Sequence, residues 1–227
     1  MVSPRRGRLG KVMATRRAKQ PPPTVVLFVR HARTPTTGSV LPGRAPGLHL
    51  ADGGRTDADK MAAHLASTAK IEAVYASPLE RAKETAEPIA RRLGLKVTVE
   101  RGLVECDFGE WTGGELKALR KLPEWRGVQS WPSGFRFPSG ESFPEMQCRV
   151  TSAVARLRSR HPGATIVAVS HADPIKAAVA EALGTHLDLF QRIVISPCSV
   201  TAIAYGEGGP LVLGVNTTNG LDEVQPS

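Results

Sequence analysis

Thr24-Val25-Val26-Leu27-Phe28-Val29-Arg30-His31 is the stretch that decides the fold, because a continuous apolar run ends directly in two polar residues. Such a run is typical of a strand buried on both faces in a parallel sheet. Similar apolar runs with β-branched residues recur between helical patterns, at 73–76, 96–99, 165–169, 200–205 and 211–215. This alternation predicts a three-layer α/β/α sandwich with a central, mostly parallel sheet.

Helix starts are marked by residues that cap helix N-termini. Ser77-Pro78-Leu79-Glu80 combines an N-cap serine, a proline and a capping-box glutamate, and Asp173-Pro174 repeats the pairing of a cap with a proline. A third capping box at 142–145 precedes apolar residues at helical spacing up to Arg160. Residues 123–140 are rich in Pro, Gly and Trp without clear periodicity, which predicts an irregular loop that could cover a site.

The charge of the chain is concentrated at one end. Its 227 residues carry a net charge of +9, but seven basic residues and no acidic one lie in residues 1–23, so the remainder is only about +2. We therefore predict a solvated basic tail over 1–23, a single catalytic domain over 24–220 and a C-terminal tail over 221–227. The distribution argues against a nucleic-acid partner.

Other classes of protein are excluded by composition. No apolar stretch approaches the roughly 18–20 residues that cross a bilayer, and the basic tail lacks the apolar run of a signal peptide. Cys106, Cys148 and Cys198 are widely spaced and odd in number, so neither a disulfide framework nor a zinc site is expected. The sequence predicts a cytoplasmic protein with no membrane partner and no metal.

Polar residues directly follow three of the predicted strands. Arg30-His31 ends the first, Ser77 with Arg81 one helical turn later follows the second, and Ser170-His171 ends another. In open α/β sheets ligands bind at the carboxyl ends of the strands, near helix N-termini. Arginine is always charged and holds phosphate bidentately, while histidine can attack phosphorus or donate to its oxygens. The sequence therefore predicts a phosphate-handling site.

The order of five motifs adds a resemblance to a known family. Val29–Thr34, Ala76–Ala86, Glu105 to Trp111, Ser139–Ser142 and Val169–His171 together closely resemble the histidine phosphatase superfamily, in its phosphoglycerate mutase-like branch. The resemblance covers residues 24–205.

What this resemblance implies is a specific set of catalytic roles. His31 would accept the phosphoryl group, and Arg30, Arg81 and His171 would neutralise its oxygens. Glu105 would give a proton to the leaving group. The resemblance implies no metal and no organic cofactor.

The first motif departs from the family pattern in two places. Ala32 replaces the usual glycine after the nucleophile, and its methyl group could crowd the phosphate. Thr37 stands where the family's mutases place asparagine. Thr37 and Arg44, the latter in a loop similar to the family's substrate-side loop, are candidate substrate-binding residues. The other four histidines have no partner motif, and we expect no function of them: His49, His64, His161 and His186.

The favoured reaction is hydrolysis of a small phosphorylated substrate. The stretch from Cys106 to Ser170 is shorter than the insertion that encloses phosphohistidine in the family's mutases, and its Gly/Pro-rich loop at 132–140 favours water as acceptor. Two alternatives stay open: a phosphoglycerate mutase-like phosphomutase and a non-catalytic phospholigand-binding protein. The apolar strands near the C-terminus could also form a homodimer interface.

Overall fold

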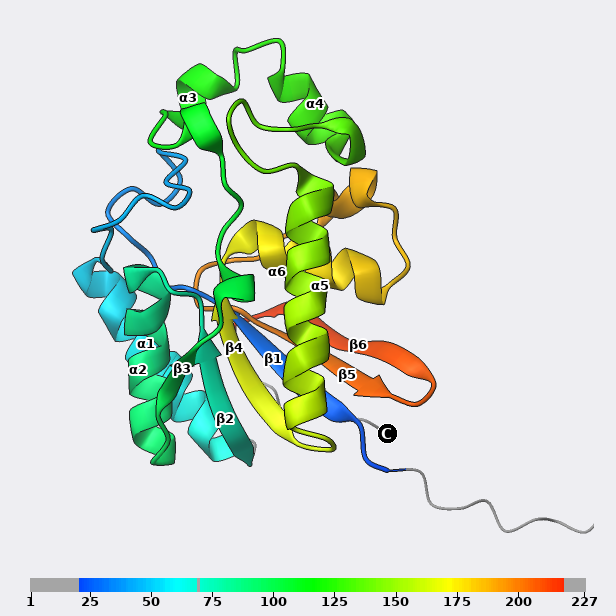
Figure 1. Ribbon diagram of the computed structural model, residues 1–227. Helices are drawn as coiled ribbons and strands as arrows, with labels where there is room; N and C mark the ends of the chain where they lie inside the picture. The colour runs from blue at the N-terminus through cyan, green and yellow to red at the C-terminus, as the bar shows by residue number, and fades with distance from the viewer. Residues whose placement is uncertain (1–20, 69, 219–227) are drawn as a thin grey trace, which may run out of the picture.

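The computed structural model describes residues 21–68 and 70–218, and its centre is a six-stranded sheet (Figure 1). The strands are β1 (Thr24–Arg30), β2 (Ile71–Ala76), β3 (Val97–Val99), β4 (Thr165–Ser170), β5 (Val200–Gly206) and β6 (Gly209–Thr217). Their order across the sheet is β3-β2-β4-β1-β5-β6. All six apolar runs predicted as strands therefore form strands of one sheet.

Strand β1 lies in the middle of this sheet. It pairs in parallel with β4, so that Arg30 lies beside Ser170, and antiparallel with β5. The pairs β2/β3 and β2/β4 are also parallel, whereas β5 and β6 form an antiparallel hairpin at one edge. The sheet is thus mostly parallel, as predicted, and the carboxyl ends of β1, β2 and β4 meet at one edge.

Long helices cover both faces of the sheet (Figure 1). On one face Met61 and Leu65 of one helix and Ile89 of the next pack in an apolar cluster with β1, β2 and β4. On the other face Met146 and Ile175 belong to a second cluster. These faces confirm the three-layer α/β/α prediction, with helices α1 (Asp52–Thr68), α2 (Glu80–Leu93), α5 (Phe143–Arg160) and α6 (Ala172–Ala182).

Shorter helices form a separate lobe beyond the carboxyl edge of the sheet, seen at the top of Figure 1. The prediction of an irregular loop over 123–140 is wrong in part, because this stretch contains a helix and a 3-10 turn. Aromatic packing orders it: Trp111 stacks on Trp125 with ring centroids 6.0 Å apart and meets Phe137 edge-on. The short elements are η1 (Arg101–Leu103), η2 (Gly109–Trp111), α3 (Leu116–Leu119), α4 (Trp125–Ser130), η3 (Pro132–Gly134) and η4 (Leu187–Arg192).

Of the three predicted helix starts, one has the predicted cap. Ser142 caps α5 through a complete capping box with Glu145. Ser77 does not cap α2: its N–H still bonds to Val169 of the sheet, and the helix begins only at Glu80. Asp173 lies inside the first turn of α6, where its carboxylate accepts a hydrogen bond from Lys176 instead of from the backbone.

The predicted basic tail over 1–23 lies outside the described residues except for 21–23, and the predicted C-terminal tail over 221–227 lies outside them entirely. In the part of the chain that is described, no helix combines the length and apolarity needed to cross a bilayer.

Candidate active site

His31 lies immediately beyond β1, in a position that buries it at the edge of the sheet. Its backbone N–H bonds to the carbonyl of Ser170, and only 6% of the residue is exposed. Nδ1 lies 2.8 Å from the Ala32 carbonyl oxygen, which can only accept, so Nδ1 carries the proton and Nε2 keeps a free lone pair. Burial, with Arg81 and Arg30 adding repulsion, lowers the pKa of His31 to about 3. The ring is therefore neutral and nucleophilic near pH 7.

His171 faces His31 from the end of β4. The two ring centroids are 5.1 Å apart, and His171 is fully buried. Its Nε2 lies 2.8 Å from the Ser77 hydroxyl, while Nδ1 is buried without a partner among the described residues. Burial lowers the pKa of His171 well below its usual value, and Arg81 adds to this. Both imidazoles are therefore neutral near pH 7.

The two predicted arginines lie beside these rings. Arg81 is fully buried, and its Nη2 donates to the Gly43 carbonyl at 2.7 Å; Nη1 of Arg30 donates to the Ile195 carbonyl at 2.6 Å. Nε of both residues and Nη1 of Arg81 are buried without a partner in the described chain. Burial lowers the pKa of both guanidinium groups, and the Glu105 carboxylate opposes this. Unpaired buried cationic N–H groups are costly, so this pair has the charge and the donors that an anion could satisfy.

Glu105 is the acidic group of the site. Its side chain is buried and accepts a hydrogen bond from the Cys106 N–H at 3.0 Å. Desolvation, with repulsion from Asp173, raises the pKa of Glu105 to about 7, although Arg81 and Arg30 oppose the rise. Near neutral pH a large share of this carboxyl group is protonated, as a proton donor requires. The neighbouring Cys106 is no candidate nucleophile, because burial raises the pKa of its thiol.

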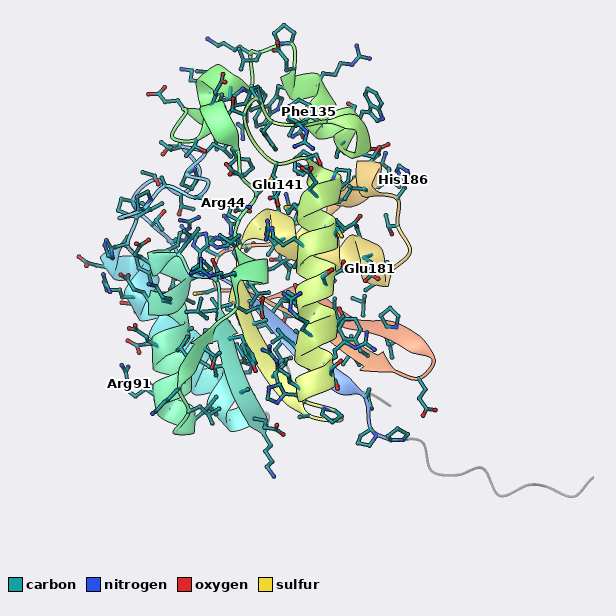
Figure 2. All side chains as sticks on the ribbon, viewed as in Figure 1. Arg44, Arg91, Phe135, Glu141, Glu181 and His186 are labelled. Carbon is teal, nitrogen blue, oxygen red and sulfur yellow. The ribbon has the colours of Figure 1, made fainter. Side chains whose placement is uncertain are left out.

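A carboxylate that sequence reasoning did not single out fixes the loop that carries Glu105. Glu141 accepts two hydrogen bonds from Arg149, at 2.9 and 2.8 Å, and one from Arg44 at 2.9 Å. Both arginines also donate to the Glu105 carbonyl, at 2.8 Å from Arg44 Nε and 3.3 Å from Arg149 Nη2. Figure 2 labels Arg44 and Glu141, which lie in two loops that meet near the start of α5. Arg44 was a candidate from the sequence, and only its place in a family motif could have drawn attention to Glu141.

The two candidate substrate-binding residues have their polar groups engaged by protein. Arg44 also forms an ion pair with Asp107, and the Thr37 hydroxyl accepts the Thr34 N–H at 2.8 Å inside a turn. These contacts do not direct either side chain toward His31, and direct contact with substrate stays a prediction for both residues.

Ala32 packs into the apolar interior beside the site. It is fully buried in a small apolar cluster with Leu50, Ala58 and Cys198, and its N–H donates to the Thr85 hydroxyl at 3.0 Å. This packing argues against the crowding of phosphate that the sequence suggested.

The remaining histidines lie elsewhere. His49 bonds to Glu84, His161 lies 2.8 Å from both the Tyr75 hydroxyl and Glu72, and His186 accepts the Asp188 N–H. Within residues 21–68 and 70–218, no three His, Cys, Asp or Glu side chains are grouped as metal ligands.

Comparison with known proteins identifies the family of this site. The sequence model of the histidine phosphatase superfamily (branch 1) matches residues 26–218. The chain belongs to the histidine phosphatase superfamily. Its relatives place it in the phosphoglycerate mutase-like branch. Similar proteins include two phosphoserine phosphatases and a glucosyl-3-phosphoglycerate phosphatase, alongside a probable phosphoglycerate mutase.

Three relatives illustrate how far this likeness extends. Phosphoserine phosphatase 1 of Hydrogenobacter thermophilus is 32% identical over 203 residues, which cover 87% of this chain and 94% of that protein. The bifunctional protein Rv2228c of Mycobacterium tuberculosis is 35% identical over 203 residues, 88% of this chain but only 55% of that protein. The chain thus spans about half the length of this relative. The mycobacterial glucosyl-3-phosphoglycerate phosphatase Rv2419c shares the fold, with a TM-score of 0.77 and 24% identity over 85% of this histidine phosphatase and 98% of that chain.

Proposed function

We propose that this protein is a phosphomonoester hydrolase that acts on a small phosphorylated metabolite through a phosphohistidine at His31. The observation that carries the proposal is the set of unpartnered guanidinium N–H groups buried beside His31. A phosphate ester dianion supplies both the negative charge and the acceptor oxygens that these groups lack. The likeness to phosphoserine phosphatase 1 over nearly its full length supports the same reaction class.

In the first displacement, Nε2 of His31 attacks phosphorus and the ester P–O bond breaks. The low pKa of His31 keeps this lone pair available, and its Nδ1–H bond to Ala32 holds the ring in the required tautomer. The leaving oxygen takes the proton of Glu105, whose raised pKa keeps it protonated near pH 7. Arg30 and Arg81 neutralise the phosphoryl oxygens during transfer.

In the second displacement, water attacks the phosphohistidine. Glu105, now a carboxylate, accepts a proton from that water, and inorganic phosphate leaves as the bond to Nε2 breaks. His31 therefore gains the phosphoryl group in the first step and loses it in the second. Glu105 donates a proton in the first step and regains one in the second.

His171 assists without having to be charged. If the Ser77 hydroxyl donates to Nε2, the ring proton is on Nδ1, the atom without a partner among the described residues. A neutral His171 then offers one hydrogen bond to a phosphoryl oxygen. A bound dianion also favours protonation of His171, which would strengthen the same contact.

Phosphate release by the wild type and two alanine variants tests this function. Phosphomonoesters are incubated near pH 6, and His31→Ala should lower release at least about a thousandfold because the nucleophile is gone. His186→Ala is the matched control: its exposed ring bonds to Asp188, and it should retain wild-type rates. Quenching into alkali, in which phosphohistidine survives, should trap labelled protein in the wild type and in His186→Ala but not in His31→Ala.

Other outcomes would replace the proposal. Trapped label with transfer to a second hydroxyl and little free phosphate would establish a mutase. Tight phosphate binding without label or turnover on any ester would establish a binding protein.

A further inference from the structure

A small cavity lies beneath the lobe formed by α3 and α4. It has a volume of about 160 Å³, close to the roughly 150 Å³ of an engineered protein cavity that accommodates benzene. Its apolar wall is formed by six side chains: Leu41, Phe108, Trp125, Val128, Phe137 and Phe143. The space therefore suits a single ring or a branched chain of similar size.

The cavity adjoins the active site through Gly43. The Gly43 carbonyl accepts a hydrogen bond from Arg81 Nη2, and Gly43 lies against the Phe108 ring that lines the cavity. Asp173, also in the wall, repels the Glu105 carboxylate. Because Glu105 is the proposed proton donor to the leaving oxygen, the carbon skeleton attached to that oxygen can extend toward this cavity.

The charge of the cavity selects among leaving groups. Among the described residues that line it, Asp173 alone is charged, and the other polar groups are the amides of Gln129 and Gln191. Lys176 is already engaged by Asp173 and Gln191. Arg44, at the Glu105 loop, is engaged by Glu141 and Asp107. A carboxylate on the leaving group would meet the Asp173 carboxylate and would have to share its ion-pair partner, Lys176.

From this arrangement we infer that the substrate is the phosphate ester of an uncharged, mostly apolar alcohol about the size of one ring. The inference rests on the proposed hydrolase function and specifies its substrate class. It separates this chain from relatives named for phosphoserine or glucosyl-3-phosphoglycerate, whose phosphate esters carry a carboxylate.

Two esters that differ only in charge test the inference. Benzyl phosphate and its para-carboxylate derivative both release a benzylic alcohol, so the leaving-group chemistry is matched and the charge in the cavity differs. We expect kcat/KM for benzyl phosphate to be at least tenfold higher, and higher than for phosphoserine. Equal or faster hydrolysis of the carboxylated ester or of phosphoserine would overturn the inference and leave the hydrolase function standing. Absence of both turnover and phosphohistidine would instead overturn the hydrolase function.

A cavity-filling variant tests where the preference arises. Val128→Phe should lower kcat/KM for benzyl phosphate at least tenfold while changing that for ethyl phosphate less than threefold, because only the ring needs the space. Val194→Phe is the matched control, since Val194 is 66% exposed and does not line the cavity. An unchanged ratio between the two esters in Val128→Phe would overturn the assignment. If that variant fails to fold, the comparison of the two benzylic esters on the wild type decides the matter.

Discussion

Ala32 shows how a departure from a family pattern can be absorbed locally. The residue after the nucleophile contributes its N–H to Thr85, and its methyl group to a buried apolar cluster with Leu50 and Cys198. The φ angle of Ala32 is not positive, so the backbone at this position does not require glycine.

Ala32→Gly should therefore weaken the fold and leave the chemistry intact. We expect a loss of about 1 kcal/mol in the free energy of unfolding, from lost apolar burial and added chain entropy, with kcat within twofold of wild type. Urea denaturation and steady-state kinetics measure the two quantities. A gain of tenfold or more in kcat would show that the methyl group does obstruct the site.

The pH dependence of kcat/KM follows from His31 and Glu105. His31 is a base whose pKa is lowered to about 3, so it is active above that pH; Glu105 is an acid whose pKa is raised to about 7, so it is active below that pH. Activity should be broad between these values and fall about tenfold per pH unit above 7. Glu105→Gln should lower kcat by about 10²–10⁴ and remove the alkaline limb. Activity that keeps rising above pH 8 in the wild type would contradict the role of Glu105.

At the scale of elements, the sequence predicted regular structure well and the beginnings of helices less well. Continuous apolar runs identify strands because a strand buried on both faces needs them. Ser77 was misread as a cap, since a local pattern does not reveal that the sheet keeps its N–H bonded to Val169. Helix α4 was missed because it is short and is stabilised by aromatic packing with η2, a contact between distant segments.

The sequence likewise predicted some parts of the candidate site and missed others. His31 and His171 could be predicted because each directly follows an apolar strand, and the carboxyl ends of parallel strands converge. The clamp of Glu141 and Arg149 around the Glu105 loop could not, because ion pairs between a loop and a helix leave no periodic signal.

Glu141→Gln tests whether this clamp positions the proton donor. Two guanidinium groups would lose a shared carboxylate, and we expect a loss of about 1–3 kcal/mol in stability together with a kcat that falls more than KM changes. Glu145→Gln, at the cap of the same helix, is the matched control and should leave kcat and the alkaline limb of the pH profile unchanged. Loss of stability without a change in kcat or pH profile would reduce the clamp to a structural role.

For the whole molecule, the anion site links ligand binding to stability. Burying Arg30 and Arg81 with unpartnered N–H groups costs stability in the empty protein, and a bound oxyanion would recover part of that cost. Phosphate or vanadate at a hundred times its Kd should stabilise the fold by about 2.7 kcal/mol. A rise in Tm with ligand concentration measures this, and Arg81→Met should abolish the rise. An equal rise in Arg81→Met would mean that the anion binds elsewhere.

The central position of β1 has a consequence for the order of events during synthesis. This strand leaves the ribosome first, yet both of its neighbours in the sheet, β4 and β5, come from the last third of the chain. A nascent polypeptide therefore carries an exposed apolar segment, with His31 unplaced, until β4 and β5 have been synthesised. Chains arrested before residue 200 should lack the proposed activity and should depend on chaperones that shield apolar segments, so that the site forms only once β5 is in place.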